Sequence, residues 1–331
     1  MQEKIKVSVP LSVYELLRRD AENFLIVKPN GEPNLNALVN TLIVNFCEEF
    51  VAAEEAARER IRAALSSVPE RYAAHALEDV MHALHETERD EGEGGRCVSL
   101  SFKPTRASEG TVLYIERVLL RNESLSSFYR RMFVDYTKRT RTVREQLIHR
   151  ENYEILRQAV SRSRRVCLSS AGGYVHEAAS VYAVAPAKDE LYNYVLFHSG
   201  GENRTVRLAK IRTVTLLPDP AEIPAESAAL FSRQIECGAQ YPIAPTDNEP
   251  IRVRLTERGR ELYRRIYLNR PTPIAIEGDE YIFHCSANQA LYYFERFGSE
   301  ALVLTPRSLG ILLRNYYHFA AKRYRAIYGK E

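Results

Sequence analysis

The chain has 331 residues, of which 45% are hydrophobic and 27% are charged. This length allows two or three domains with apolar cores. No stretch approaches the roughly 20 apolar residues of a membrane span, and the first residues lack the apolar segment of a secretory signal. We therefore expect a cytoplasmic protein without a membrane partner, whereas the net charge of +3 favours no class of ligand.

Charge is distributed unevenly along the chain. Residues 51–96 carry 6 Lys and Arg against 11 Asp and Glu, whereas 129–165 carry 11 against 4 and 251–331 carry 14 against 8. This separation indicates basic faces for a polyanion beside an acidic helical segment, although ordinary solvated helix faces produce the same pattern. The five cysteines are widely spaced and include no C-x-x-C pair, which favours reduced thiols.

Residues 4–9 alternate between polar and apolar side chains, which predicts a half-buried strand. Pro10 opens a helix that ends at the Pro-Asn-Gly turn at 29–31, and a second amphipathic helix begins near Asn34. This order of elements resembles a ribbon-helix-helix unit, in which two strands pair as an antiparallel ribbon. A second strand is needed because one short strand can neither pair its backbone nor bury its apolar face alone.

A second copy of the pattern lies at 98–139. An alternating strand at 98–102 is followed by Pro104 and by two further amphipathic helices. Aligning Asn34 with Ser124 superposes five apolar pairs: Leu35 and Leu125, Leu38 and Phe128, Leu42 and Met132, Ile43 and Phe133, and Phe46 and Tyr136. We predict an internal duplication whose strands pair within one chain; the alternative is two β-α-α pieces in unrelated packing.

The outward face of the predicted ribbon is a candidate nucleic-acid surface. In ribbon-helix-helix proteins this face enters the major groove of DNA, so the resemblance makes DNA a candidate partner. The outward positions here hold three lysines and three serines. The candidate ribbon residues are Lys4, Lys6, Ser8 and Lys103.

The segment between the two copies is predicted to be helical from Val51 to Leu84, with a break near 66–69, and to end in an acidic loop at 86–95. His82 and His85 lie one helical turn apart, which could clamp a divalent metal. A solvated helix face gives the same spacing more often. We therefore expect no metal site and no cofactor.

A basic helical segment leads into a run of short strands. The strand 166–170, a Gly-Gly turn, a second strand to Val184 and a hairpin over 191–211 predict a small β-barrel. The hairpin resembles the signature of WYL domains, Sm-like barrels named for a Trp-Tyr-Leu triplet. Tyr194 matches the centre of that triplet, and Arg207 and Lys210 match the two basic positions of the following strand.

The resemblance implies a nucleic-acid-binding face on the barrel. Ser169 stands where the family has an aromatic residue, and His176 is the nearest substitute for a missing arginine. The candidate residues are Tyr194, Arg204, Arg207, Lys210, Ser169, His176, Arg164 and Arg165. Strict alternation would put Arg207 on the face opposite Arg204 and Lys210, so a bulge or bend is required.

A structural alternative applies to the same residues. Tyr194 could be a core ring, and the arginines could pair with Glu190 or Glu202.

After a Pro-rich connector, residues 251–331 show the order β-α-β-β-α-β-α, a ferredoxin-like plan. This part resembles the C-terminal extension found on WYL domains. Its last helices are rich in Tyr and Phe, which at helical spacing more often form a core or a subunit contact than a stacking platform. We therefore expect a homodimer formed through this module.

The predicted fold class is α+β with several domains. The expected parts are ribbon-helix-helix unit 1 (1–50), a helical insert with an acidic loop (51–96), a second ribbon-helix-helix-like unit (97–140), a basic linker helix (141–165), the WYL barrel (166–217), a Pro-rich linker (218–250) and the ferredoxin-like extension (251–331).

No catalytic motif is present in the sequence, so we expect no enzyme. The ribbon-helix-helix start, Tyr192-Asn-Tyr194, Leu-Thr-Glu-Arg-Gly at 255–259 and Asn269-Arg-Pro271 together resemble accessory proteins of type VI-D CRISPR loci. That resemblance implies a protein that binds single-stranded RNA and enhances cleavage by the RNA-guided effector nuclease. The alternative is a DNA-binding transcriptional repressor whose barrel senses a small ligand.

Overall fold

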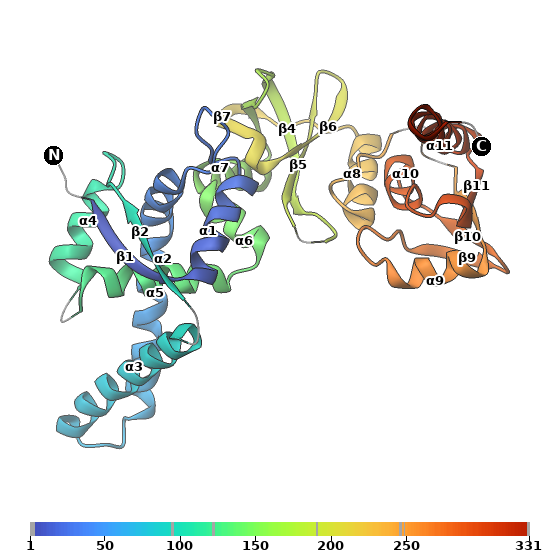
Figure 1. Ribbon diagram of the computed structural model, residues 1–331. Helices are drawn as coiled ribbons and strands as arrows, with labels where there is room; N and C mark the ends of the chain where they lie inside the picture. Colours follow the sequence, from blue (N-terminus) through green and yellow to red (C-terminus); the bar gives the residue numbers. More distant parts are fainter. Residues whose placement is uncertain are drawn as a thin grey trace. The chain divides into compact units, whose positions relative to one another are not determined.

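The computed structural model describes residues 4–93, 96–120, 123–189, 191–244, 247 and 249–329, excluding the side chains of 82 and 84–93. Helices and antiparallel sheets occur together, as the α+β prediction requires (Figure 1). The chain divides into two compact units, 1–150 and 151–331.

Unit 1 is a two-stranded ribbon packed on helices. Its elements are β1 (Ile5–Pro10), α1 (Leu11–Asn23), α2 (Leu35–Ala64), α3 (Glu70–Glu93), β2 (Cys97–Phe102), α4 (Glu109–Tyr114), the π-helical turn η1 (Ile115–Leu119), α5 (Leu125–Lys138) and α6 (Arg141–Ile148).

The two ribbon strands pair with each other, so the predicted pairing within one chain is confirmed. β1 and β2 run antiparallel, with Val7 opposite Leu100 at the centre. The side chains of Val7 and Leu100 are buried, whereas the alternate side chains Lys6, Ser8 and Ser101 are exposed.

The second helix of each repeat starts in the same way. The Asn34 side chain accepts a hydrogen bond from the Ala37 N–H, and the Ser124 side chain accepts one from the Ser127 N–H, each at 3.1 Å. Both are N-cap contacts that satisfy a helical N–H lacking a backbone partner. The alignment of Asn34 with Ser124 therefore matches structurally equivalent positions.

The apolar pairs of the duplication build the core of unit 1. All of the pairs except Leu35 and Leu125 are buried. The rings of the equivalent residues Phe46 and Tyr136 lie 6.2 Å apart between centroids. Beside them Asp20, 2% exposed, accepts hydrogen bonds from Tyr136 Oη at 2.9 Å and from Arg144 Nε at 2.7 Å. The last contact ties α6 into this unit.

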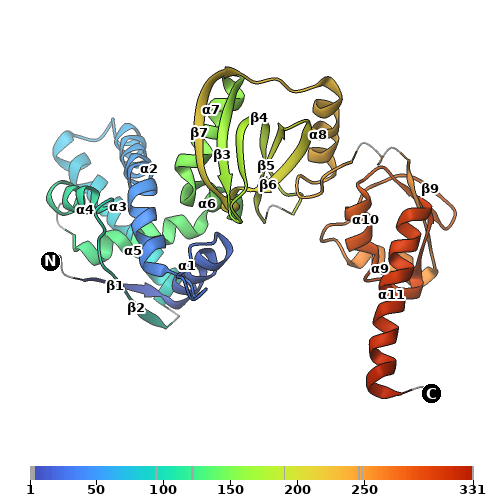
Figure 2. The same ribbon diagram turned by 90° about the horizontal axis from the view of Figure 1, so that it is seen from above.

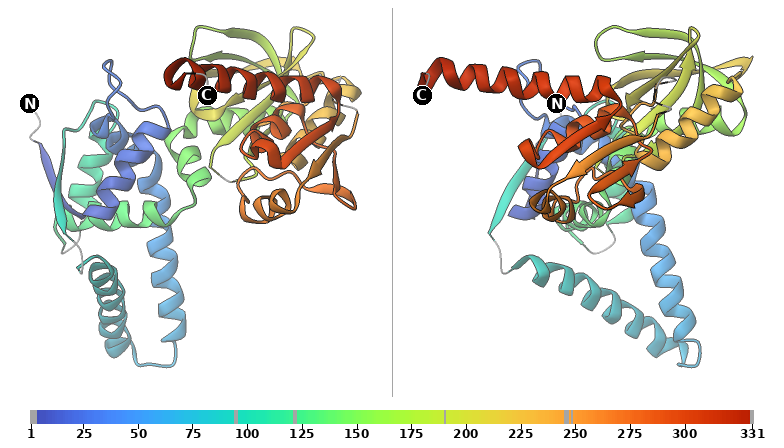
Figure 3. Two further views of the ribbon diagram at one scale, coloured as in Figure 1. Left: turned by 45° about the vertical axis from the view of Figure 1, so that its right-hand side comes forward. Right: turned by 90° about the vertical axis from the view of Figure 1, so that its right-hand side faces the viewer.

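α2 and α3 form a helical arm that extends away from the ribbon (Figure 3). The chain breaks between Ala64 and Glu70, as predicted, but α3 continues to Glu93, so the acidic loop expected from residue 86 is wrong up to that point. α2 is the one helix in the described residues long and apolar enough to cross a membrane, and its N-terminal half supplies buried residues to the core of unit 1.

Unit 2 contains a five-stranded and a four-stranded antiparallel sheet (Figure 2). Its elements are α7 (Arg150–Ser161), β3 (Arg164–Ser170), β4 (Val175–Pro186), β5 (Asn193–Ser199), β6 (Glu202–Arg207), the 3-10 turn η2 (Leu208–Lys210), β7 (Ile211–Pro220), α8 (Ala225–Cys237), β8 (Ile251–Leu255), α9 (Glu257–Arg265), β9 (Pro273–Glu277), β10 (Glu280–Phe283), α10 (Ala287–Phe294), the 3-10 turn η3 (Gly298–Glu300), β11 (Ala301–Thr305) and α11 (Arg307–Tyr328).

The five-stranded sheet is strongly curled but is not a closed barrel. Its order is β6-β5-β4-β3-β7, and no pairing joins β6 to β7 among the described strands. Only the three residues of η2 connect these two edges. A flat sheet would separate its edges by about 19 Å, whereas the four residue steps from Arg207 to Ile211 reach at most about 14 Å. The sheet must therefore coil until its edges approach. Because the edges do not pair, the closed barrel expected from the sequence is wrong.

Helices cover both faces of this sheet. On one face, Leu156 and Ala159 of α7 pack against the buried residues of the strands. The segment 141–165, predicted as one basic linker helix, thus contains the two helices α6 and α7, and α7 packs on the sheet. On the other face Phe231 of α8 packs against Leu196. The Pro-rich segment 218–250 thus supplies a packed helix as well as a connection.

The C-terminal module has the element order predicted from the sequence. Its sheet order is β11-β8-β10-β9, and its core holds the rings of Tyr263, Phe283, Tyr293 and Phe294. Five of the aromatic side chains on which the predicted homodimer rests are exposed: Tyr292, Tyr316, Phe319, Tyr324 and Tyr328.

Candidate nucleic-acid interface

The hairpin of β5 and β6 places the predicted site residues on two opposite faces of the curled sheet. Gly200 and Gly201 form its turn with φ of 61° and 79°, the left-handed values that favour glycine. The register sets Tyr194 opposite Arg207 and Phe197 opposite Arg204. Because Phe197 lies in the core beneath α7 and Tyr194 packs beside α8, Arg204 and Arg207 point to different faces.

Arg207 lies over an aromatic ring. Its guanidinium carbon lies 3.4 Å from the centroid of the Tyr192 ring, within the range of a strong cation–π contact. Tyr192 was not among the predicted binding residues. It lies diagonally across the hairpin from Arg207, two residues before Tyr194, and this diagonal relation is the sequence signal that could have identified it.

Tyr194 itself is partly buried against the apolar cluster of Leu196 and Phe231. This placement favours the structural alternative, a ring that belongs mainly to the core.

Arg204 and His176 form a separate cluster on the other face. Arg204 pairs with Glu202, as the structural alternative anticipated. The His176 ring packs edge-on against Phe197 at 4.9 Å between centroids, with Nδ1 3.3 Å from Ser199 Oγ. Burial and the nearby Arg204 charge lower the pKa of His176, so its neutral form is favoured.

The remaining predicted cations lie elsewhere on the sheet. Lys210 is exposed on η2, and the described residues form no ion pair with it. η2 bends the chain after Arg207, so it redirects Lys210 but leaves Arg204 and Arg207 on opposite faces. Ser169 shares a hydrogen bond of 2.6 Å with Thr213, so its hydroxyl is already engaged.

Arg164 contacts the last part of β7, and Arg165 contacts the segment that follows it. Arg164 donates to the Pro218 carbonyl, and Arg165 Nη2 lies 3.0 Å from Glu222 Oε2. Both arginines are thus engaged within unit 2. Glu190, the other predicted acidic partner, lies outside the described residues.

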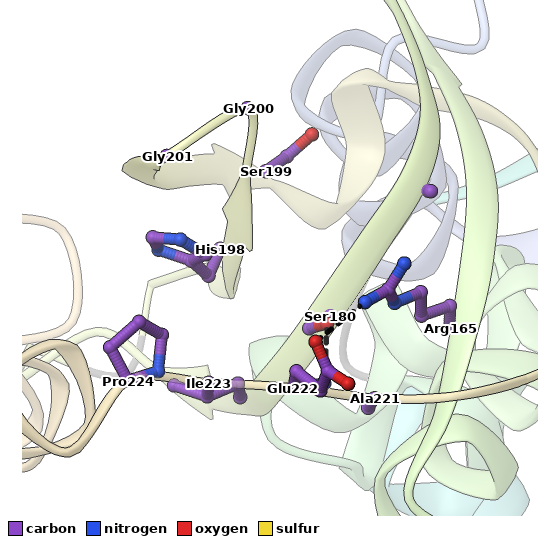
Figure 4. A pocket seen from close by; sticks show the side chains of 11 residues that line it. Arg165, Ser180, His198, Ser199, Gly200, Gly201, Ala221, Glu222, Ile223 and Pro224 are labelled. Atoms are coloured by element: carbon purple, nitrogen blue, oxygen red, sulfur yellow. Dashed lines mark hydrogen bonds and ion pairs between the residues drawn. The ribbon is translucent and has the colours of Figure 1, made fainter.

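A pocket of about 790 Å³ opens beside the Arg165–Glu222 pair. Figure 4 shows these two side chains pointing toward each other near Ser180, with His198 and the glycine turn across the pocket. The Glu222 N–H donates to Ser180 Oγ at 3.0 Å, and His198 Nδ1 lies 3.0 Å from Asn203 Oδ1. The pocket therefore offers a cation, a carboxylate and an imidazole to a polar ligand.

The ribbon of unit 1 presents its own exposed surface. Lys4, Lys6, Ser8 and Lys103 are all exposed, as predicted. Arg130 Nε donates to the Ser8 carbonyl at 2.6 Å, which fixes β1 against α5. A rigid two-stranded ribbon with outward lysines has the dimensions that enter a major groove.

No metal cluster of three or more His, Cys, Asp or Glu occurs among the described residues. The side chains of His82 and His85, the pair with metal-like spacing, lie outside the described part of the chain.

No protein-family model matches this sequence, and no curated protein does. A solved structure described as the crystal structure of a CRISPR Cas-related protein shares the fold, with a TM-score of 0.66 and 16% identity over 98% of this chain and 95% of that one. Proteasome accessory factor B/C of Arthrobacter aurescens aligns with a TM-score of 0.23 and 14% identity, over 66% of this chain and 35% of that one.

Proposed function

We propose that this protein is a non-enzymatic accessory protein of a type VI-D CRISPR system, which binds single-stranded RNA and enhances cleavage by the RNA-guided effector nuclease. Two findings support this. The fold matches that of a CRISPR Cas-related protein along nearly the whole chain, and the sequence resembles type VI-D accessory proteins at the hairpin and in the C-terminal module. Fold alone does not define function, so the RNA-binding part is argued from the site.

The observation that carries the proposal is the stack of Arg207 on Tyr192. Proteins that recognise single-stranded RNA stack bases on aromatic rings and on guanidinium planes. A guanidinium held over a ring is the planar, cationic kind of group on which an RNA base can stack. The ring holds the guanidinium in place, so little side-chain entropy would be lost on binding.

Substitutions at the stack test RNA binding directly. We expect Arg207→Ala and Tyr192→Ala each to weaken binding of a fluorescent single-stranded RNA by about tenfold, since stacking contributes about 1–3 kcal/mol per base. Fluorescence anisotropy over a salt series measures the affinity. Arg207→Lys separates the two contributions, because it keeps the charge but loses the planar stack.

Glu202→Ala is a matched control, since it removes an exposed partner of Arg204 on the other face. Wild-type RNA affinity in both Arg207→Ala and Tyr192→Ala would refute the proposed site. The enhancing role requires a second assay, in which the effector nuclease cleaves RNA with and without this protein. In the Arg207→Ala variant, the enhancement of cleavage should fall in proportion to the loss of affinity for RNA.

A DNA-binding transcriptional repressor is the second candidate function, and the exposed ribbon is the observation that favours it. Lys6 lies on β1 and Lys103 directly follows β2, and neither makes an ion pair in the described structure. If the ribbon reads duplex DNA, the double variant Lys6→Ala/Lys103→Ala should lower the duplex affinity and the slope of its salt dependence. Loss of duplex binding in this variant with RNA binding unchanged would favour the repressor.

We also propose a homodimer in the cytoplasm, assembled through the C-terminal module. The exposed aromatic side chains of α11 support this part, because a long helix rarely leaves such residues unpartnered. Sedimentation velocity of the full chain tests it.

A further inference from the structure

A groove of about 740 Å³ lies in unit 1, where α2 and α3 of the arm face η1 and α5. Its floor is apolar. Met81 and Phe128 are buried there, whereas Val118, carried by the π-helical turn, is 56% exposed. Turns of this kind often occur at functional sites. Another apolar surface can pack on this floor and on the exposed valine at its edge.

The rim of the groove is strongly acidic. Arg58 and Arg131 are its cations, and its five carboxylates belong to Glu54, Glu55, Glu78, Asp79 and Glu123. Two cations against five carboxylates give a net charge of −3 when His75 is neutral.

Both rim arginines are already paired inside unit 1. Arg58 lies 2.7 Å from Glu78, and Arg131 pairs with Glu54 and Glu123. Burial lowers the pKa of Arg131 to about 10, which still leaves it charged at neutral pH. Glu55 and Asp79 lie exposed at the rim, with His75 Nε2 3.6 Å from Asp79 Oδ2, so the surface of the groove is acidic.

α11 has the complementary character. Arg307–Tyr328 contains five Lys and Arg and no Asp or Glu. Leu309 and Leu313 are buried in the C-terminal module, and the same helical stripe continues with Tyr324 and Ile327, which are 66% and 73% exposed. α11 runs on past the strands of its module (Figure 2). Its second half is therefore a basic helix with an uncovered apolar stripe.

We propose that the second half of α11 docks into the acidic groove of a second copy of this chain. The helix and the groove are complementary in two ways. The apolar stripe of α11 matches the apolar floor, and its cations match the acidic rim. Packing α11 on another α11 would instead bring two helices of like charge together. Two reciprocal contacts would close a two-fold dimer. The inference rests on the proposed homodimer and is independent of RNA binding.

Charge exchange in the full-length chain tests this contact. The groove variant is Glu55→Arg/Asp79→Arg, and the helix variant is Lys322→Glu/Arg323→Glu. Each should raise the dimer dissociation constant at least about tenfold, because like charges then face each other. The combination of all four changes should restore the dimer. Glu236→Arg/Glu261→Arg, the same charge change at exposed positions of unit 2, should leave the dimer intact.

Sedimentation velocity over a concentration series gives the dissociation constants, and circular dichroism checks that helix content is retained. Three results would overturn the proposal. The wild-type chain could be monomeric at all concentrations, the groove variant could dimerise like wild type, or the combined variant could dimerise no more tightly than the groove variant and the helix variant. A groove variant that loses only nuclease enhancement would assign the groove to the effector instead. RNA affinity, measured on the same variants, should not change, so failure here is distinguishable from failure of the RNA proposal.

Discussion

At the scale of single residues, the candidate site depends on partners that lie far away in sequence. Arg165 pairs with Glu222, and Arg207 lies over the ring of Tyr192, the residue before β5. The Arg165 side chain is half-buried and that of Glu222 is exposed, and an ion pair that solvent reaches contributes little to stability. Such a pair can therefore open for an anionic ligand at small cost, whereas a buried pair cannot.

The buried Asp20 is the residue whose partner matters most for stability. Arg144→Ala would leave the Asp20 carboxylate with one fewer compensating charge in the core of unit 1. We expect a loss of about 3–5 kcal/mol in the free energy of unfolding of that unit, measured by urea denaturation. Arg18→Ala, which removes an exposed pair with Glu22, should cost no more than about 1 kcal/mol. Equal effects of the two substitutions would contradict this assignment.

His176 makes the curled sheet sensitive to acid. Because its folded pKa is lowered, the unfolded chain binds the proton more readily, so stability is lost as the pH falls from about 6.5 toward the lowered value. Arg204→Ala removes one cause of the lowering, and the pKa of His176 should then rise. NMR titration of the His176 ring measures this, with Lys210→Ala as the control. A pKa that stays constant in Arg204→Ala would show that burial alone sets it.

At the scale of elements, the duplication places chemically different residues in the same role. Asn34 and Ser124 cap equivalent helices although the residues differ, because both side chains can accept a backbone hydrogen bond.

The two helix caps should therefore be equivalent in energy. We expect Asn34→Ala and Ser124→Ala each to destabilise unit 1 by about 1 kcal/mol, measured by thermal and urea unfolding. Ser66→Ala, at an exposed position between α2 and α3, should have no measurable effect. A large difference between the two cap variants would mean that one helix end has other support.

At the scale of the whole molecule, the chain divides between α6 and α7. Each unit has its own hydrophobic core, and the core of unit 1 draws on both repeats.

Each unit should consequently fold without the other. Fragments 1–150 and 151–331 are expected to keep their helix content and to unfold cooperatively, as circular dichroism with thermal melting would show. A fragment ending at residue 50, which has a single repeat, should remain unfolded because its strand has no partner and its helices have no complementary face. A cooperative transition in that short fragment would contradict the mutual dependence of the repeats.

The sequence by itself determined the duplicated strands, the paired helix starts, the hairpin and the element order of the C-terminal module. These features follow from periodicity and turn residues, which act over a few positions and can be identified without long-range information. The tertiary structure alone decided that the sheet curls without closing, that α3 extends to Glu93 and that an acidic groove lies beside η1. The physical reason is that register, curl and packing depend on contacts between distant residues, which local pattern does not specify.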